Sequence, residues 1–274
     1  MEQSNQNKTI SILGCGWLGF PLAKTLVAKG WQVQGSTTTP QKLQLLQEAG
    51  IKPFLLALDA DSDLSDSTFF DADVLFVNVP PSRKLSQNGY LDKMKTLLAA
   101  IQTSPIKKVV FISSTSVYGD VCREVSEADE PDNPSELLQA EILFLSAKNL
   151  QTTVIRFGGL FGPDRNPGRF FRDKNSIPNG LVPVNLIHLN DCLGLIKAVL
   201  NQQNFAGVYN AVAPSHPTKQ EFYGKAILKS GFAAPEFVAE KTAWKIINAD
   251  KIIRDLNYQF QYPDLLKCLD DPGA

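Results

Sequence analysis

Three glycines near the N-terminus have the spacing of a phosphate-binding turn. They form the pattern G-x-G-x-x-G between a short apolar run and a stretch with helical periodicity. In such a turn the first glycine permits the tight bend, the second lets a pyrophosphate approach the backbone, and the third lets helix and strand pack closely. The N–H groups at the start of the helix then favour an anion, so the pattern predicts a dinucleotide site. The residues predicted to bind the dinucleotide in this turn are Gly14, Gly16, Trp17, Leu18 and Gly19.

The segment after the next apolar run bears on which dinucleotide is bound. An acidic residue at this place hydrogen-bonds the ribose 2′-OH and repels a 2′-phosphate. Residues 35–42 read GSTTTPQK and contain no carboxylate. Hydroxyl groups and Lys42 could instead donate hydrogen bonds to a phosphate, so NADP is favoured over NAD. The same hydroxyls could also begin the next helix, and the two roles are compatible. The hydroxyl residues predicted to bind the cofactor are Ser36, Thr37 and Thr38.

The elements that must position these residues alternate between strands and helices. Short apolar runs predict buried strands at Thr9–Leu13, Gln32–Gly35, Phe54–Leu58, Val74–Asn78, Lys108–Ile112 and Thr153–Arg156. Helical periodicity predicts helices at Leu18–Lys29, Gln41–Glu48, Tyr90–Gln102 and Ser135–Lys148. This alternation is typical of an α/β fold with a doubly wound parallel sheet, the Rossmann fold.

The carboxyl ends of the strands bring further residues to the same groove. In a doubly wound sheet the ligand lies outside these ends, at the point where the strand order reverses. The third, fourth and fifth strands end at this edge, so residues there are expected to contact the cofactor. These residues are Asp59, Val79, Pro80 and Ser113.

The second half of the chain is less regular. Residues 158–183 are rich in glycine, proline and asparagine. The elements expected after them are a helix at Asp191–Asn201, a strand near Val208–Asn210 and a helix at Lys219–Lys229. The sequence thus predicts a disordered tail at residues 1–8, a dinucleotide-binding domain at 9–157, and a smaller irregular C-terminal lobe of the same compact unit at 158–274. Substrate specificity is expected in the lobe.

Three further motifs resemble one enzyme family. The sequence VFISSTSVYG spans residues 110–119, VIRFGGLFGP spans 154–163, and IHLND spans 187–191. Together with the glycine turn, they resemble the extended short-chain dehydrogenases/reductases, which include nucleotide-sugar epimerases and dehydratases. The resemblance implies an NAD(P)-binding oxidoreductase or epimerase that acts on a small carbonyl compound or a nucleotide sugar. It also implies that Ser114 polarises the substrate.

The acid/base pair of that family is absent from this sequence. The family carries a Tyr-x-x-x-Lys pair some way after the polarising serine, and the lysine and the nicotinamide lower the pKa of the tyrosine. Residues 131–148 read PDNPSELLQAEILFLSAK and contain no tyrosine. If Ser114 sets the alignment, the tyrosine position falls at Gln139 and the lysine position at Leu143. If Glu141 sets it, they fall at Asn133 and Leu137. Neither pair can move a proton, so the chain resembles atypical members with a nonstandard acid/base.

Ser114 and Tyr118 are the predicted catalytic residues in place of that pair. Tyr118 could instead be a packing residue at the edge of the site. His188 could act as a base near neutral pH, although a histidine in an apolar run is more often a hydrogen-bonded core residue. Arg165 and Arg169 could bind an anionic substrate or lie in a solvated loop.

Two other interpretations stay open. Loss of both the tyrosine and the lysine also fits a non-catalytic NADP-binding sensor or scaffold protein. In addition, residues 14–23 (GCGWLGFPLA), Lys42-x-x-x-Leu46 and residues 72–74 resemble the β-hydroxyacid dehydrogenases. That family needs a second catalytic lysine region on a long helical C-terminal domain, and the Gly/Pro-rich lobe argues against it.

Composition limits the partners of the protein. The 274 residues include 27 lysines and arginines and 28 aspartates and glutamates, for a formal net charge of -1. A nucleic acid or an anionic membrane surface would favour a basic surplus. No apolar run approaches the ~18 residues that a membrane helix needs. We therefore expect a small-molecule substrate, no nucleic acid and no membrane, with the protein a monomer or a homodimer.

The cysteines and the N-terminus indicate a cytoplasmic location. The four cysteines are widely spaced, with no C-x-x-C pair and no neighbouring histidines at metal-ligand spacing, so no metal site is predicted. The polar N-terminus predicts a short tail and not a signal peptide. These features are typical of a reducing compartment.

Overall fold

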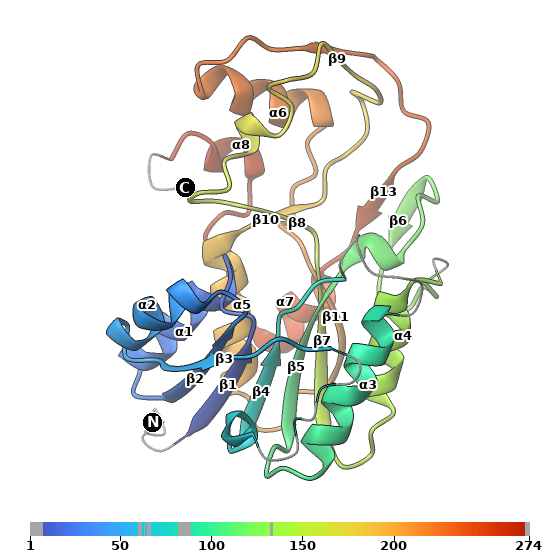
Figure 1. Ribbon diagram of the computed structural model, residues 1–274. Coiled ribbons are helices and arrows are strands. Elements are labelled where there is room, and N and C mark those ends of the chain that lie inside the picture. The colour runs from blue at the N-terminus through green and yellow to red at the C-terminus, as the bar shows by residue number, and fades with distance from the viewer. Residues whose placement is uncertain are drawn as a thin grey trace. The chain divides into compact units, whose positions relative to one another are not determined.

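The computed structural model describes residues 8–59, 62, 64, 67–81, 89–131 and 134–271. The tail expected at residues 1–8 lies outside this part of the chain, apart from Lys8. The described residues form an α/β fold around a seven-stranded parallel sheet (Figure 1). The prediction of a doubly wound Rossmann fold is therefore confirmed.

The strand order of the sheet is β11-β7-β5-β4-β1-β2-β3. The order reverses between β1 and β4, and both pair in parallel with each other, with Ile12 opposite Phe76. On its other side β1 pairs with β2, with Ile12 opposite Gly35. The crevice beyond the carboxyl ends of β1 and β4 is where a doubly wound sheet binds its ligand. The strands are β1 (Thr9–Leu13), β2 (Gln32–Thr37), β3 (Lys52–Leu55), β4 (Val74–Val77), β5 (Lys108–Ser114), β7 (Gln151–Phe157) and β11 (Gly207–Ala211).

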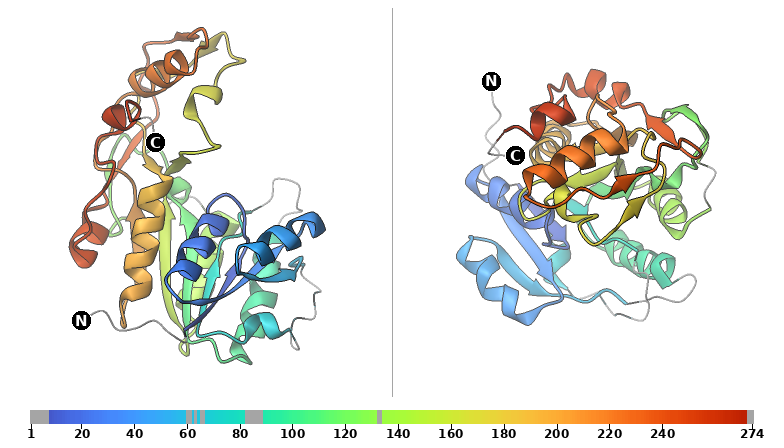
Figure 2. Two further views of the ribbon diagram at one scale, coloured as in Figure 1. Left: turned by 90° about the vertical axis from the view of Figure 1, so that its left-hand side faces the viewer. Right: turned by 90° about the horizontal axis from the view of Figure 1, so that it is seen from above.

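The central strands are mostly apolar and buried because helices cover both faces of the sheet. All four residues of β4, VLFV, are buried, as are the last four residues of β1. Strands covered on both faces read as continuous apolar runs. Figures 1 and 2 show α1 and α2 on one face and α3 and α4 on the other. These helices are α1 (Gly19–Ala28), α2 (Leu43–Glu48), α3 (Gly89–Gln102) and α4 (Glu136–Leu145).

The third strand begins earlier than predicted. The apolar run predicted Phe54–Leu58, whereas β3 spans Lys52–Leu55. This strand is at the edge of the sheet and pairs with β2 until Leu55 lies opposite Thr37, the last residue of β2. Its side chains are exposed or half-buried, so the apolar run does not mark the strand boundaries.

The chain divides into two compact units, each built from three segments. The first comprises residues 1–113, 134–155 and 203–208, and the second comprises 114–133, 156–202 and 209–274. The sequence had predicted two continuous ranges divided after residue 157. That boundary stays a prediction.

The second unit contains short elements that the sequence did not predict. Three pairs of parallel strands lie within it, β8 with β10, β9 with β12 and β6 with β13. These strands are β6 (Arg123–Val125), β8 (Gly159–Phe161), β9 (Ser176–Ile177), β10 (Leu186–His188), β12 (Glu236–Phe237) and β13 (Lys245–Ile247). The helices of this unit are α5 (Leu189–Asn201), α6 (Lys219–Lys229), α7 (Asp250–Leu256) and α8 (Leu265–Cys268). Of these, α5 and α6 lie within two residues of their predicted bounds.

The described part of the chain was compared with what a membrane helix, a metal cluster and a disulfide require, with three results. No helix there has both the length and the apolarity needed to cross a membrane. No three of its histidines, cysteines, aspartates and glutamates are grouped so that they could hold a metal ion. Its four cysteines are free thiols.

Candidate cofactor site

The first glycine of the turn has a conformation and a close contact that exclude a side chain. Gly14 has φ +99°, in the left-handed region. Its N–H donates to Ser36 Oγ at 2.9 Å, and its carbonyl accepts from Asn78 Nδ2 at 3.1 Å. A Cβ atom on Gly14 would lie 2.6 Å from the carbonyl oxygen of Asn78. The turn is thus fixed between the ends of β2 and β4.

The other two glycines have opposite surroundings. A Cβ atom on Gly19 would lie 2.2 Å from the carbonyl oxygen of Gly14, so helix α1 starts in direct contact with the turn. A Cβ atom on Gly16 would meet no atom within 4 Å. The space over Gly16 is what a pyrophosphate needs to reach the backbone.

The N-terminus of α1 has neither a side-chain cap nor an acidic residue in its own first turn. Leu18 is the N-cap residue and makes no side-chain hydrogen bond to the helix, and the first turn holds no acidic residue. The first N–H groups of a helix carry a partial positive charge. This end of α1 is therefore suited to an anion.

A cavity of about 380 Å³ opens beside the turn. Its lining comes from the turn, the ends of β2, β3 and β4, and the first turns of α3. Eight predicted residues line it: Gly14, Gly16, Ser36, Thr37, Thr38, Asp59, Val79 and Pro80. Four other predicted residues are not part of its lining: Trp17, Leu18, Gly19 and Ser113.

The hydroxyls at the end of β2 differ in what they already contact. Ser36 is buried and its Oγ accepts from the turn, and Thr37 Oγ1 accepts from Thr39 N at 3.1 Å. Thr38 and Lys42 are exposed and line the cavity. Ser36 and Thr37 thus shape this edge of the cavity, whereas Thr38 and Lys42 present polar groups to it.

The lining also includes residues outside the twelve predicted to bind the cofactor, among them Asn78, Tyr90 and Lys93. Asn78 holds the turn, as described above, and Tyr90 and Lys93 come from α3. Tyr90 is buried, and its hydroxyl donates to Val79 O at 2.9 Å. Burial raises the pKa of Tyr90 well above its usual value. The position of Asn78 at a strand end was a signal for its role, but only the packing of α3 brings in Tyr90 and Lys93.

Comparison with known proteins decides the family. A family model described as NAD(P)H-binding matches residues 14–185, which is more than half of the chain. The chain belongs to this NAD(P)H-binding family. It is also 36% identical over 271 residues to the protein YeeZ of Escherichia coli (strain K12), a match that covers 94% of this chain and 98% of YeeZ.

Solved structures show the same fold. The structure is similar to UDP-glucuronic acid 4-epimerase of Bacillus cereus in complex with UDP-glucuronic acid and NAD, with a TM-score of 0.77, 20% identity and 96% of each chain covered. It is also similar to human epimerase family protein SDR39U1 (isoform2) with NADPH, with a TM-score of 0.73 and 18% identity, covering 96% of this chain and 97% of that one. The predicted resemblance to extended short-chain dehydrogenases/reductases is confirmed as an NAD(P)-binding, epimerase/dehydratase-like fold.

Within this NAD(P)H-binding protein, the end of β5 is held by a buried pair. Ser113 Oγ donates a short hydrogen bond to the carboxylate of Glu141 on α4, and both side chains are buried. Ser114 follows as the N-cap of a 3₁₀ turn, η3 (Thr115–Val117), and its Oγ accepts from Ser116 N at 3.1 Å. Ser113 therefore anchors the strand, and the substrate contact of the half-buried Ser114 stays a prediction.

The positions of the family's acid/base pair carry no proton donor. Gln139 on α4 is exposed and Leu143 is half-buried. In the other register Leu137 is buried, and Asn133 lies outside the described residues. Helix α4 contains neither tyrosine nor lysine. The absence predicted from the sequence thus holds along this helix.

Tyr118 is enclosed within the second unit. It is 3% exposed, and its hydroxyl accepts from Arg156 Nη1 at 2.7 Å and donates to Asn210 Oδ1 at 3.1 Å. Burial raises the pKa of Tyr118, against a smaller opposing effect of Arg156. These contacts are typical of a packing tyrosine. Its catalytic role stays a prediction.

His188 is a core residue of the second unit. It is 1% exposed, and its Nδ1 accepts from Asn190 N at 3.2 Å as the N-cap of α5. Burial lowers the pKa of His188 to about 4. The ring is therefore neutral at pH 7. This agrees with the core role that the sequence had left as one of two options.

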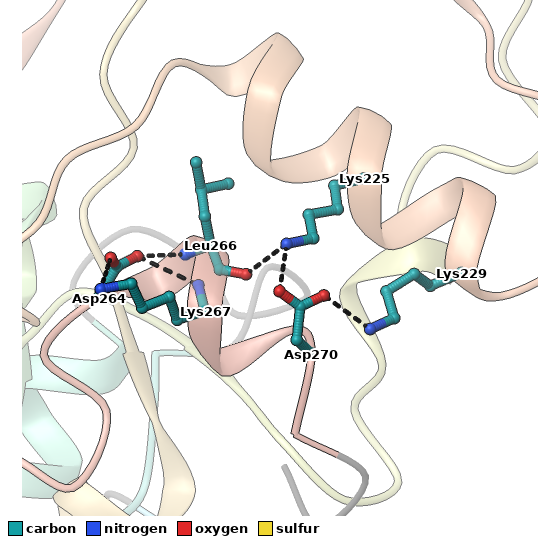
Figure 3. Close-up of polar contacts among 6 residues, drawn as sticks. All are labelled: Lys225, Lys229, Asp264, Leu266, Lys267 and Asp270. Atoms are coloured by element: carbon teal, nitrogen blue, oxygen red, sulfur yellow. Dashed lines mark hydrogen bonds and ion pairs between the residues drawn. The ribbon is translucent and has the colours of Figure 1, made fainter.

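A second cavity, of about 260 Å³, lies within the second unit. Lys229 lines it, and Arg165 and Arg169 are not part of its lining. Figure 3 shows Lys225 and Lys229 of α6 turned toward the carboxylate of Asp270, with Nζ–Oδ distances of 2.7 and 2.9 Å. The lysine charge beside this cavity is thus already paired.

Proposed function

We propose that this protein is an NADP(H)-dependent oxidoreductase or epimerase that acts on a small carbonyl compound or a nucleotide sugar. One observation carries the proposal. The phosphate-binding turn, the carboxylate-free end of β2 and Lys42 line the same cavity. An acidic residue at the end of β2 would repel a 2′-phosphate, whereas hydroxyls and a lysine attract one.

The residues of this cavity fit a dinucleotide cofactor. The open space over Gly16 and the uncapped start of α1 suit a pyrophosphate. Thr38 and Lys42 would bind the 2′-phosphate, and Val79 and Pro80 would lie against the nicotinamide side. The cofactor, when bound, supplies hydride transfer. The similar structures with bound NAD and with bound NADPH support a dinucleotide here without choosing between the two.

The residues of this chain are proposed mainly to bind and orient the substrate and the cofactor, with few groups that could transfer a proton. Ser114 at the end of β5 is the group proposed to polarise a substrate oxygen, with Ser113 and Glu141 fixing the strand below it. With no tyrosine or lysine on α4, the proton that accompanies hydride transfer is proposed to come from Tyr118 or from water. A changed acid/base pair lowers the rate of hydride chemistry without abolishing it.

A non-catalytic NADP-binding sensor or scaffold is the second candidate. It is favoured by the absence of both Tyr and Lys from α4 and by the enclosed hydroxyl of Tyr118. The two candidates share the cofactor cavity and differ in whether bound NADPH is oxidised.

The cofactor is tested by titrating the protein with NADPH and NADH, followed by nicotinamide fluorescence and calorimetry. We expect NADPH to bind at least about tenfold more tightly, because a charge-assisted contact contributes more than a neutral one. Gly16→Asp is the control that places a carboxylate in the pyrophosphate position. Absence of binding by both dinucleotides to folded wild-type protein would refute both candidates.

Catalysis is tested next by NADPH oxidation in the presence of small aldehydes and ketones, and by interconversion of UDP-sugars with bound cofactor. Turnover that falls in Ser114→Ala would support the enzyme, and a fall in Tyr118→Phe as well would assign Tyr118 its predicted catalytic role. Binding without any turnover would favour the sensor.

We also propose that the protein works in the cytoplasm, as a monomer or a homodimer. The free state of all four cysteines agrees with a reducing compartment. Size-exclusion chromatography with light scattering measures the oligomeric state directly.

A further inference from the structure

One ion pair lies at the edge of the cofactor cavity. Lys93 Nζ on α3 is 2.8 Å from Asp59 Oδ1, in the segment after β3, and both residues line the cavity. The side chain of Lys93 is 19% exposed and that of Asp59 is 68% exposed. Lys93 is therefore the better fixed partner, because α3 and the cavity wall cover most of it.

This pair governs the charge of the cavity. Among the described lining residues, the groups charged at neutral pH are Lys42, Lys93 and Asp59, so Asp59 is the one carboxylate. While Lys93 neutralises Asp59, Lys42 leaves these described lining residues with a net charge of one positive. Without Lys93, the carboxylate would cancel the charge of Lys42.

We propose that Lys93 determines the cofactor preference by neutralising Asp59, so that the cavity accepts the extra phosphate of NADP(H). The inference rests on the proposed NADP(H) site. A 2′-phosphate adds nearly two negative charges, so an unpaired carboxylate in the same cavity penalises NADPH more than NADH. Lys93 is thus a specificity-determining residue that acts through another side chain.

Three variants separate this role from a direct contact. Lys93→Met removes the lysine charge and keeps an apolar stem of similar length. Asp59→Asn removes the carboxylate, and the double variant removes both charges and restores the net charge of the wild type. Lys95→Met is the matched control, since Lys95 is on the same helix, pairs with Asp92 at 2.9 Å and does not line the cavity.

The measurement is the dissociation constant of each folded variant for NADPH and NADH, at low and high salt. We expect Lys93→Met to weaken NADPH binding about fivefold and NADH binding less than about twofold, with both effects reduced by salt. Asp59→Asn should raise the ratio of the NADH to the NADPH dissociation constant, because the carboxylate that opposes the extra phosphate is gone. The double variant should return this ratio to within about twofold of the wild type, because its cavity charge is the same.

Two results would overturn the proposal. Unchanged NADPH affinity in Lys93→Met would show that the pair has no influence on the cofactor. A double variant with the same lowered preference for NADPH over NADH as Lys93→Met would show that Lys93 contacts the phosphate itself. The two dissociation constants of the wild type are measured before those of any variant. Equal values for NADH and NADPH would refute the proposed preference for NADP(H) itself.

Discussion

Polar side chains have opposite roles in two regions of the molecule. At the cofactor cavity of the first unit they stay exposed, and in the second unit they are buried and hydrogen-bonded. In the cavity, Thr38 and Lys42 are exposed, and the backbone at Gly16 is open. In the second unit, Tyr118 and His188 are almost fully buried and each already has a hydrogen-bond partner. A polar group that binds a ligand must keep its hydrogen-bonding capacity at a surface, whereas a buried one must use it within the fold. Substitutions in the two regions should therefore affect different measurements.

The largest effect is expected where a glycine contacts backbone. Gly19→Ala should lower the free energy of unfolding by about 4 kcal/mol, because its Cβ atom would overlap the carbonyl oxygen of Gly14. Urea-induced unfolding followed by circular dichroism measures this. Gly16→Asp is the contrasting variant, expected to lose NADPH binding and to unfold within about 0.5 kcal/mol of the wild type. If the two variants were equally stable, this would contradict the conclusion that Gly19 is packed against backbone and Gly16 is open.

A comparable loss of stability without loss of binding is expected at Asp191 in the second unit. Its carboxylate is fully buried and accepts from Gln261 N at 2.7 Å, Tyr262 N at 3.0 Å and Tyr258 OH at 3.0 Å. Asp191→Ala leaves these donors without their acceptor and should cost about 3 kcal/mol. The NADPH dissociation constant, measured by fluorescence, should change less than twofold. A stable variant that fails to bind NADPH would contradict the proposal that Asp191 stabilises the fold without affecting the cofactor site.

The pH dependence of stability should report His188. Its pKa is about 4 in the folded protein, compared with about 6.5 for an exposed histidine. Between these values the unfolded chain binds more protons, so stability rises with pH across this window and is lost as pH falls through it. From this group alone, the free energy of unfolding should be about 2 kcal/mol lower at pH 5 than at pH 7.

The variant His188→Asn isolates that contribution. Asparagine can still accept from the start of α5, so the helix cap is retained. Urea unfolding of both proteins at pH 5 and pH 7 should show a smaller difference in the variant. An identical difference in the two proteins would assign the pH dependence to other groups.

The smallest effect is expected from Tyr118→Phe. Loss of the hydroxyl removes contacts with Arg156 and Asn210 and should cost about 1 kcal/mol. NADPH affinity and any turnover should stay within twofold of the wild type if Tyr118 is a packing residue. A tenfold or greater drop in turnover at unchanged stability would restore its predicted catalytic role.

The sequence by itself determined the sheet and the phosphate-binding turn. Buried parallel strands need continuous apolar runs, and the turn needs glycines at fixed spacing, so both leave a local pattern. This is why the strands were predicted well except β3, whose edge position removes the apolar pattern. The absence of a tyrosine and a lysine along α4 was equally visible, because it concerns residue types alone.

Only the tertiary structure decided which polar side chains face the cavity. Tyr90 and Lys93 are on α3 and Asp59 follows β3, so their meeting depends on how α3 packs beside the ends of β3 and β4. Burial likewise decided that His188 is neutral and that Tyr118 is enclosed. Desolvation and hydrogen bonding depend on neighbours in space, and a residue's neighbours in sequence do not specify them.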